Sequence, residues 1–175
     1  MPFLIDKIVP EGHYKYWECV FSEVLNPFDP HPGRGRVVVY NGDIDYAPIA
    51  HTISSKYGFF FGCRPLGCSS YIVGVKDGNE VDLIDSEQKL LAFIGHIDNL
   101  EEVVLNIKAN GYWFDSDTLI GGAYRERKSD YLLYLRESSS APVTYRSVRA
   151  ILTKQGYLTV LDRTVYRQEN VYIIE

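Results

Sequence analysis

The apolar positions in the N-terminal part of the chain predict one helix followed by strands. From Tyr14 to Leu25, apolar side chains recur at three- and four-residue spacing, which is typical of one face of a helix. Asn26-Pro27 would end this helix, because the residue before a proline is disfavoured in helical conformation. Arg36–Tyr40 and Tyr57–Ile84 are rich in β-branched and aromatic residues and are therefore expected to form strands.

Lys76-Asp77-Gly78 predicts the turn of a hairpin within this β-rich part. A three-residue loop puts glycine at the left-handed position that such loops require. The same register gathers apolar residues of both strands on one face, namely Tyr71, Val73, Val75, Val81 and Leu83. The acidic Glu80 and Asp82 fall on the other face, so only one side of this hairpin is expected to cover a core.

Two helices are predicted between residues 86 and 110. Ser86 is a favourable N-cap for the first helix. Asp98 and Glu101 have the spacing of a capping box for the second, with Asp98 as the cap. Gly111 suits the left-handed residue that commonly follows a helix. Because only a few residues join them, the two helices are expected to form a pair that covers a sheet.

The remainder of the chain predicts an antiparallel meander. Its expected strands lie near Leu119–Glu126, Tyr131–Arg136, Thr144–Thr153, Tyr157–Arg167 and Val171–Ile174. A three-residue turn at Lys154-Gln155-Gly156 would align the apolar residues of the flanking strands on one face. The residues on that face would be Val148, Ala150, Leu152, Leu158 and Val160. Arg149 and Arg163 would then share the opposite face, where a partner could bind.

These elements combine into the α+β class. We expect an antiparallel sheet, formed by the C-terminal meander, to pack against the helix pair near 86–110, next to the N-terminal helix and the β-rich segment. With 175 residues and 46% hydrophobic side chains, the chain is long enough to bury a core of its own. A single domain over 1–175 is therefore expected, and a subdivision into 1–84 and 85–175 is the alternative.

The cysteines and the first residues bear on the compartment. No run of about 20 apolar residues is present, so no membrane-spanning helix is expected. Asp6 interrupts the apolar start, which argues against a signal peptide and for a cytoplasmic protein, unless a leader has been trimmed away. Cys19, Cys63 and Cys68 form an odd set, so reduced thiols are expected, with a Cys63–Cys68 bridge as the alternative.

Charge is distributed unevenly along the chain. The formal net charge is −5, yet residues 118–175 carry nine basic and only six acidic side chains. Seven of those nine are arginine, and the same segment holds seven of the 14 tyrosines. Arginine and tyrosine interleaved on strands can form a face for an acidic partner, whereas the overall negative charge disfavours nucleic acid.

Catalytic motifs are sparse. The sequence contains no phosphate loop, no glycine-rich dinucleotide-binding turn and no nucleophile elbow. His51 lies twelve residues before Cys63, so a Cys63–His51 dyad, oriented by Asp43 or Asp45, is one candidate. Catalysis by this dyad would require the fold to bring the thiol and the imidazole together.

Asp115 and Asp117 form the other catalytic candidate. Two carboxylates beside the aromatic stretch 112–114 are typical of carbohydrate-hydrolysing sites. The four histidines are too scattered for a zinc site, and no run of acids follows the spacing of a calcium loop. Neither a metal nor a cofactor is therefore expected.

The leading functional expectation is a non-enzymatic interaction protein of the immunity or adaptor type. It would bind another protein through the sheet face that carries Arg149 and Arg163. The alternative is a small-ligand-binding α+β domain. Its pocket would be lined by four aromatic residues, Tyr112, Trp113, Tyr124 and Tyr131. A hydrolase built on either of the two catalytic candidates ranks third.

Overall fold

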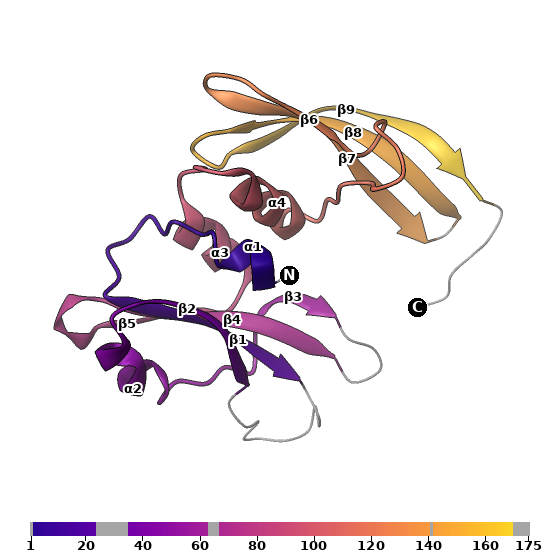
Figure 1. The fold of residues 1–175 in the computed structure, drawn as a ribbon. Coiled ribbons are helices and arrows are strands. Elements are labelled where there is room, and N and C mark those ends of the chain that lie inside the picture. The colour runs from indigo at the N-terminus through magenta and orange to yellow at the C-terminus, as the bar shows by residue number, and fades with distance from the viewer. Residues whose placement is uncertain (1, 24–34, 63–66, 141, 170–175) are drawn as a thin grey trace. The chain divides into compact units, whose positions relative to one another are not determined.

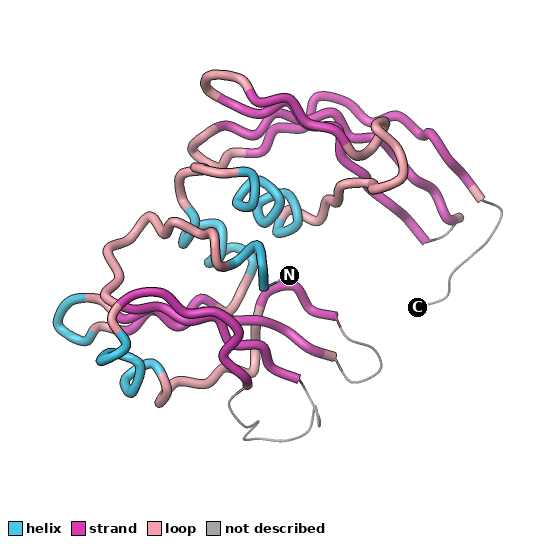
Figure 2. The backbone as a smooth tube through the Cα atoms, viewed as in Figure 1, coloured by secondary structure: helices cyan, strands magenta, loops and turns pink. Residues whose placement is uncertain are grey.

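A computed structural model describes residues 2–23, 35–62, 67–140 and 142–169 of the chain. Contacts divide the chain into two compact units, Met1–Gly95 and His96–Glu175. Each unit has its own antiparallel sheet and its own helical elements, so the predicted α+β class is confirmed (Figures 1 and 2). Among the described residues, no helix is long and apolar enough to cross a membrane.

The first unit is built on five strands. They are β1 (Tyr16–Glu23), β2 (Arg36–Gly42), β3 (Phe59–Gly62), β4 (Cys68–Val75) and β5 (Val81–Ile84). The sheet has the order β2-β1-β4-β3, β5 also pairs with β4, and every pairing is antiparallel. The helical elements are α1 (Pro2–Ile5), η1 (Ile44–Tyr46), α2 (Ala47–Ala50), η2 (Asp77–Asn79) and α3 (Glu87–Ile94). The β-rich part predicted after residue 36 is thereby confirmed.

The helix predicted for Tyr14–Leu25 is wrong, because this segment contains β1. The strand lies between β2 and β4, and all residues from Tyr16 to Val20 are buried. A strand buried on both faces carries large apolar side chains without strict alternation, so its spacing also satisfies a helical template. Its aromatic and β-branched composition favours the strand once neighbours on both sides are available for pairing.

The β4–β5 hairpin has the predicted faces but a longer loop. Val75 pairs with Val81, and a hydrogen bond of 2.8 Å from Lys76 N to Glu80 O closes the loop. Gly78 has a φ of +75°, the left-handed conformation expected of it. Because the register moves by an even number of residues, the apolar side chains stay on the predicted face.

The second unit consists of a helix and a four-stranded sheet. Its elements are α4 (Leu100–Ala109), β6 (Ala123–Glu126), β7 (Asp130–Ser140), β8 (Val143–Thr153) and β9 (Leu158–Gln168). The strands follow the order β6-β7-β8-β9, so the predicted antiparallel meander is confirmed. The further strand expected at Val171–Ile174 lies outside the described residues. The sequence analysis predicts that α3 and α4 form one helix pair, whereas in the structure they belong to different units.

Both predicted helix starts are found, the second one residue later than expected. Ser86 caps α3 and accepts a hydrogen bond of 3.3 Å from Lys89 N. Asn99 rather than Asp98 caps α4, since Asn99 Oδ1 accepts from Glu102 N at 2.9 Å. Glu102 completes the box by accepting from Asp98 N at 2.7 Å. The predicted pair Asp98 and Glu101 is therefore displaced by one residue, and Glu102 is fully buried.

The sheet of the second unit has two different faces. The inner face carries Leu133, Leu135, Val148, Ala150 and Leu152, all fully buried. Helix α4 lies along this face (Figure 1), and Asn106 Nδ2 donates to Gly156 O at 3.2 Å. Leu152 pairs with Leu158, so the predicted three-residue turn between β8 and β9 is confirmed. The outer face is the opposite one and carries Arg136, Tyr145, Ser147 and Arg149.

The prediction that Arg149 and Arg163 share a face is wrong. The register shifts at the Arg149–Ala150 step, where β9 contains one extra residue. Arg149 therefore pairs with Asp162 on the outer face, while Arg163 pairs with Val148 on the inner face. A one-residue bulge reverses the faces of the positions beyond it, here as far as a second register shift at the Tyr145–Arg146 step, after which Arg167 pairs with Tyr145 on the outer face. A bulge of this kind has no clear sequence signal in a mixed strand.

The capping geometry of α4 can be tested by paired substitutions. We expect Asn99→Ala to lower the free energy of unfolding by about 1 kcal/mol, because Glu102 N loses its acceptor. Asp98→Ala should cost clearly less, since Asp98 contributes its backbone N–H to the box. Urea unfolding of both variants measures the difference. A larger loss in Asp98→Ala would contradict the observed cap.

Candidate functional site

Tyr112 and Arg163 are the two predicted binding residues that the structure brings together. Arg163 Nη2 donates to Tyr112 OH at 2.9 Å, and Arg163 Nε lies 3.3 Å from Glu137. Arg146 approaches the same Glu137 at 3.7 Å. These contacts belong to the inner face, so Arg163 is used within the unit rather than displayed on the predicted outer surface.

The other predicted aromatic residues are distributed differently. Tyr131 is buried, with its hydroxyl 2.6 Å from Lys154 Nζ. Tyr124 is half-exposed and packs against Phe114, with ring centroids 6.5 Å apart. Trp113 is half-exposed under the ammonium group of Lys108. Among the described residues, no ring contact or hydrogen bond joins the four aromatic residues expected to line one pocket.

The chain between residues 113 and 122, called the 113–122 segment below, is held against the second sheet. Trp113 exchanges two backbone hydrogen bonds with Arg136, of 3.1 and 2.7 Å. Ser147 Oγ donates to Ile120 O from the outer face. Gly122 allows a tight fold, because a Cβ at this position would lie 1.8 Å from the carbonyl oxygen of Asp115. The segment is therefore fixed although it contains no helix or strand.

Asp115 anchors this segment, and the paired-carboxylate site predicted for it is not supported by its contacts. Tyr166 OH donates to Asp115 Oδ2 at 2.6 Å, and Asp117 N donates to Asp115 Oδ1 at 2.9 Å. These hydrogen bonds, the one from Tyr166 first, lower the pKa of Asp115. Burial and the bonded carboxylate raise the pKa of Tyr166 to about 12. Asp115 is thus ionised at neutral pH and has no proton to donate as a general acid.

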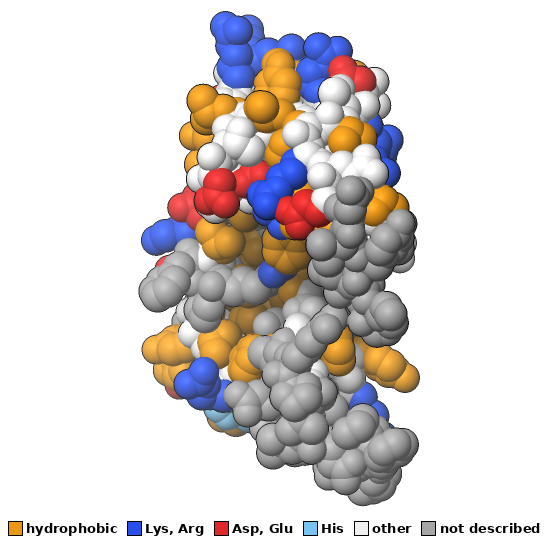
Figure 3. All heavy atoms as spheres, turned by 90° about the vertical axis from the view of Figure 1, so that its right-hand side faces the viewer, with side chains coloured by type: hydrophobic (Ala, Val, Ile, Leu, Met, Phe, Trp, Pro, Cys, Tyr) orange, Lys and Arg blue, Asp and Glu red, His pale blue; other side chains and the backbone are white. Residues whose placement is uncertain are grey.

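Three large apolar side chains of the 113–122 segment point to solvent. Trp113 is 52% exposed, Leu119 79% and Ile120 54%. Figure 3 shows basic, acidic and apolar side chains interspersed on the unit that contains the β6–β9 sheet. The face of this unit seen in Figure 3 is therefore mixed in charge rather than uniformly basic.

His51 in the first unit is paired with an acid that the sequence did not suggest. Its Nε2 lies 3.2 Å from Glu18 Oε2, whereas Asp43 caps η1 by accepting from Asp45 N at 3.0 Å. The expected orientation of His51 by Asp43 or Asp45 is therefore wrong. Glu18 is fully buried on β1 and also accepts from Tyr16 OH at 2.8 Å. A sequence signal for this pair existed, because Glu18 is an acidic residue within an apolar stretch. The wrong helix prediction for Tyr14–Leu25 hid the inward position of Glu18 on a strand.

The cysteines do not form the predicted set of reduced thiols. Cys68 is disulfide-bonded, and Cys63, the nucleophile of the predicted dyad, lies outside the described residues. Cys19 is a free, buried thiol, and burial raises its pKa to about 12. A thiol of this kind is not a nucleophile at neutral pH. Since disulfides are typical of oxidising compartments, the bond at Cys68 does not support the cytoplasmic expectation.

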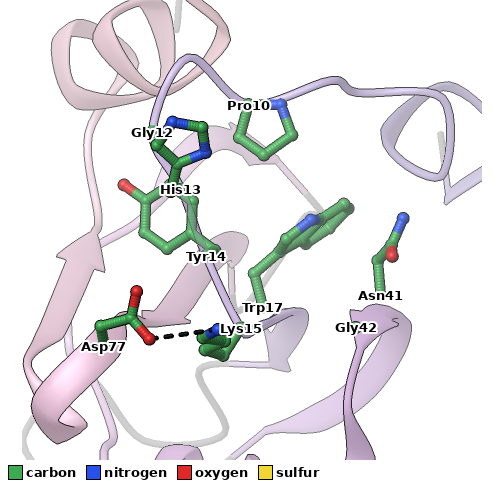
Figure 4. Close-up of a pocket in the computed structure, with 9 residues that line it drawn as sticks. All are labelled: Pro10, Gly12, His13, Tyr14, Lys15, Trp17, Asn41, Gly42 and Asp77. Carbon is green, nitrogen blue, oxygen red and sulfur yellow. Dashed lines mark ion pairs between the residues drawn. The ribbon is translucent and has the colours of Figure 1, made fainter.

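A pocket of about 460 Å³ lies in the first unit at the start of β1 and the end of β2. His13 and Tyr14 stand on one side of it, and Trp17 and Asn41 on the other (Figure 4). An ion pair of 3.2 Å between Lys15 and Asp77 lies at its border. Polar groups make up most of its lining, and the rings of Tyr14 and Trp17 complete the wall.

Neither a cluster of metal ligands among the described residues nor a similar known protein indicates a function for this chain. In the part of the chain that the structure describes, no three His, Cys, Asp or Glu side chains gather as metal ligands. The chain matches no family model, no curated protein and no solved structure.

The buried Glu18–His51 pair can be tested by a double-mutant cycle. We expect His51→Ala to lower the free energy of unfolding by about 1–3 kcal/mol, because a buried carboxylate loses a hydrogen-bonding partner. In a Glu18→Gln background the same substitution should cost less, giving a coupling energy above about 0.5 kcal/mol. Chemical denaturation of the four proteins measures it. Strictly additive losses would show that the two groups do not interact.

Proposed function

We propose that the protein is a non-enzymatic protein-binding module, and that the 113–122 segment on its second sheet is the contact surface. The observation that carries the proposal is the exposure of Trp113, Leu119 and Ile120 on a segment held in place by hydrogen bonds. Clustered large apolar side chains at a surface are typical of interaction sites.

The rigidity of the segment supports the same function. A binding loop that is ordered before association loses little conformational entropy when a partner arrives. Trp113 brings the aromatic side chain type that most often dominates interface energies. Arg149, predicted as a contact residue, lies on the same outer face two residues from Ser147, which bonds Ile120. Arg149 Nη2 lies 2.8 Å from Asp162 Oδ2, so the charge of Arg149 is balanced within the unit. We therefore place Arg149 at the rim of the contact surface.

A matched pair of isoleucine substitutions tests this proposal. The wild-type protein and the variants Ile120→Ser and Ile44→Ser are immobilised, and proteins retained from lysate of the native host at high salt are identified. We expect Ile120→Ser to reduce retention of the specific partner at least tenfold, because it removes an apolar contact. Ile44→Ser is the control, since Ile44 is 56% exposed in the first unit and Ile120 is 54% exposed.

Thermal unfolding ensures that the comparison concerns binding and not folding. Both isoleucines are exposed, so each variant should retain the melting temperature of the wild type within a few degrees. Equal retention of every protein by the wild type and Ile120→Ser would refute the assignment of the contact surface.

A second candidate function is small-ligand binding in the pocket of the first unit, favoured by its volume and by Tyr14 and Trp17 in its wall. In a Trp113→Phe background Trp17 is the sole fluorophore of its kind, since the chain has two tryptophans. We expect ring-containing fragments with polar substituents to change its emission saturably. His13→Ala should weaken the effect and His96→Ala should not, and a fragment library without any saturable response would eliminate this candidate.

A further inference from the structure

The outer face of the second sheet contains an arginine arrangement that the contact surface alone does not explain. Arg136 Cζ lies 4.7 Å from the ring centroid of Tyr145, and Arg167 Cζ lies 5.4 Å from it. The register accounts for both distances, because Arg167 pairs directly with Tyr145 and Arg136 is its diagonal neighbour on β7. A guanidinium group stacked on a ring keeps its N–H donors available in its own plane.

Arg136 differs from Arg167 in its hydrogen bonding. Arg167 is paired with Glu169, whereas no side-chain hydrogen bond or ion pair joins Arg136 to another described residue. Its Nε is unsatisfied and closed to solvent, so an incoming acceptor can bind only the terminal Nη groups of the guanidinium. The neighbouring Asp115 already accepts hydrogen bonds at both of its oxygens, from Tyr166 and from Asp117 N. A partly desolvated guanidinium without an acceptor is a favourable site for an oxyanion.

We propose that Arg136 is the receptor for a carboxylate, supplied by an Asp or Glu side chain of the partner protein. This inference rests on the proposed protein-binding function. The two oxygens of a carboxylate match the planar fork of a guanidinium group. Asp115 and Glu169 lie beside the arginines, so a phosphate dianion would be repelled more strongly than a monoanionic carboxylate.

The surroundings of Arg136 also indicate the kind of segment that carries this carboxylate. A Cβ built on Gly121 would lie 3.4 Å from the Cβ of Arg136, so the exposed Ile120 borders the site. Trp113 adjoins it from the other end of the segment through its backbone pairing with Arg136. The surface therefore favours an acidic residue flanked by apolar ones.

NMR titration of the ¹⁵N-labelled 175-residue chain tests the inference through the arginine Nε–Hε signals and, in all variants alike, through the backbone amide signals. The probes are acetyl-Leu-Glu-Leu-amide, its Gln counterpart, sodium acetate and inorganic phosphate, at constant ionic strength. The variants are Arg136→Gln and Arg136→Lys, with Arg125→Gln as the matched control, because Arg125 is an exposed arginine on β6. Loss of a signal in Arg136→Lys assigns the Arg136 resonance.

We expect saturable shifts with the Glu peptide, an affinity at least tenfold lower in both Arg136 variants, and no change in Arg125→Gln. The Gln peptide and acetate should bind at least tenfold more weakly, and phosphate more weakly than acetate. Unsaturable shifts, or equal binding by Arg136→Gln, would overturn the site. If acetate bound as tightly as the Glu peptide, the carboxylate would not need to come from a partner's side chain, and that part of the proposal would be wrong. If phosphate bound more tightly than acetate, the choice of a carboxylate as the ligand would be wrong.

The capture experiment separates this inference from the function on which it rests. Loss of partner in Ile120→Ser together with full retention in Arg136→Lys would leave the protein-binding function standing and refute the role of Arg136. If Arg136→Gln does not fold, Arg136→Lys preserves the charge while removing the planar fork, and the titration of the wild type still decides whether a carboxylate binds.

Discussion

The pairing of β7 with β8 is the constraint on which the second unit depends. These strands are eleven residues long and pair in an uninterrupted antiparallel register, so every side chain is assigned to the inner or the outer face. A slip by one residue would exchange the faces and bring Arg136 to α4 and Leu135 to solvent. The buried core under α4 and the Arg136–Tyr145 arrangement are therefore two consequences of a single register.

Strands β8 and β9 pair with two register shifts, and the 113–122 segment contains no helix or strand. The bulge at the Arg149–Ala150 step turns Arg163 inward, where it bonds Tyr112, and leaves Arg149 outward. The 113–122 segment precedes β6 in the chain and forms no regular strand. The hydrogen bond from Tyr166 OH to Asp115 Oδ2 nevertheless holds it against the sheet. The sheet therefore carries an ordered loop with exposed apolar groups.

The first unit uses buried polar groups differently. Glu18 is completely removed from water, and the cost of burying its carboxylate is offset by a hydrogen bond from Tyr16 OH and by the contact with His51 Nε2 at 3.2 Å. The half-exposed His51 connects this carboxylate to the surface. Breaking one partner of such a buried group is more destabilising than replacing the whole set by apolar side chains.

Local chemistry in the sequence was sufficient for the α+β class, the strands after residue 36, the caps near Ser86 and Gly111, the faces of the β4–β5 hairpin, and the faces of the β8–β9 hairpin next to its turn. These depend on alternation, capping groups and left-handed glycines, which act over a few residues. Tertiary structure alone decided that Tyr16–Val20 is a central strand, that a bulge separates Arg149 from Arg163, and that Arg136 lies beside Tyr145. Each of these depends on which strands become neighbours, and pairing between distant segments leaves no periodic trace in either one.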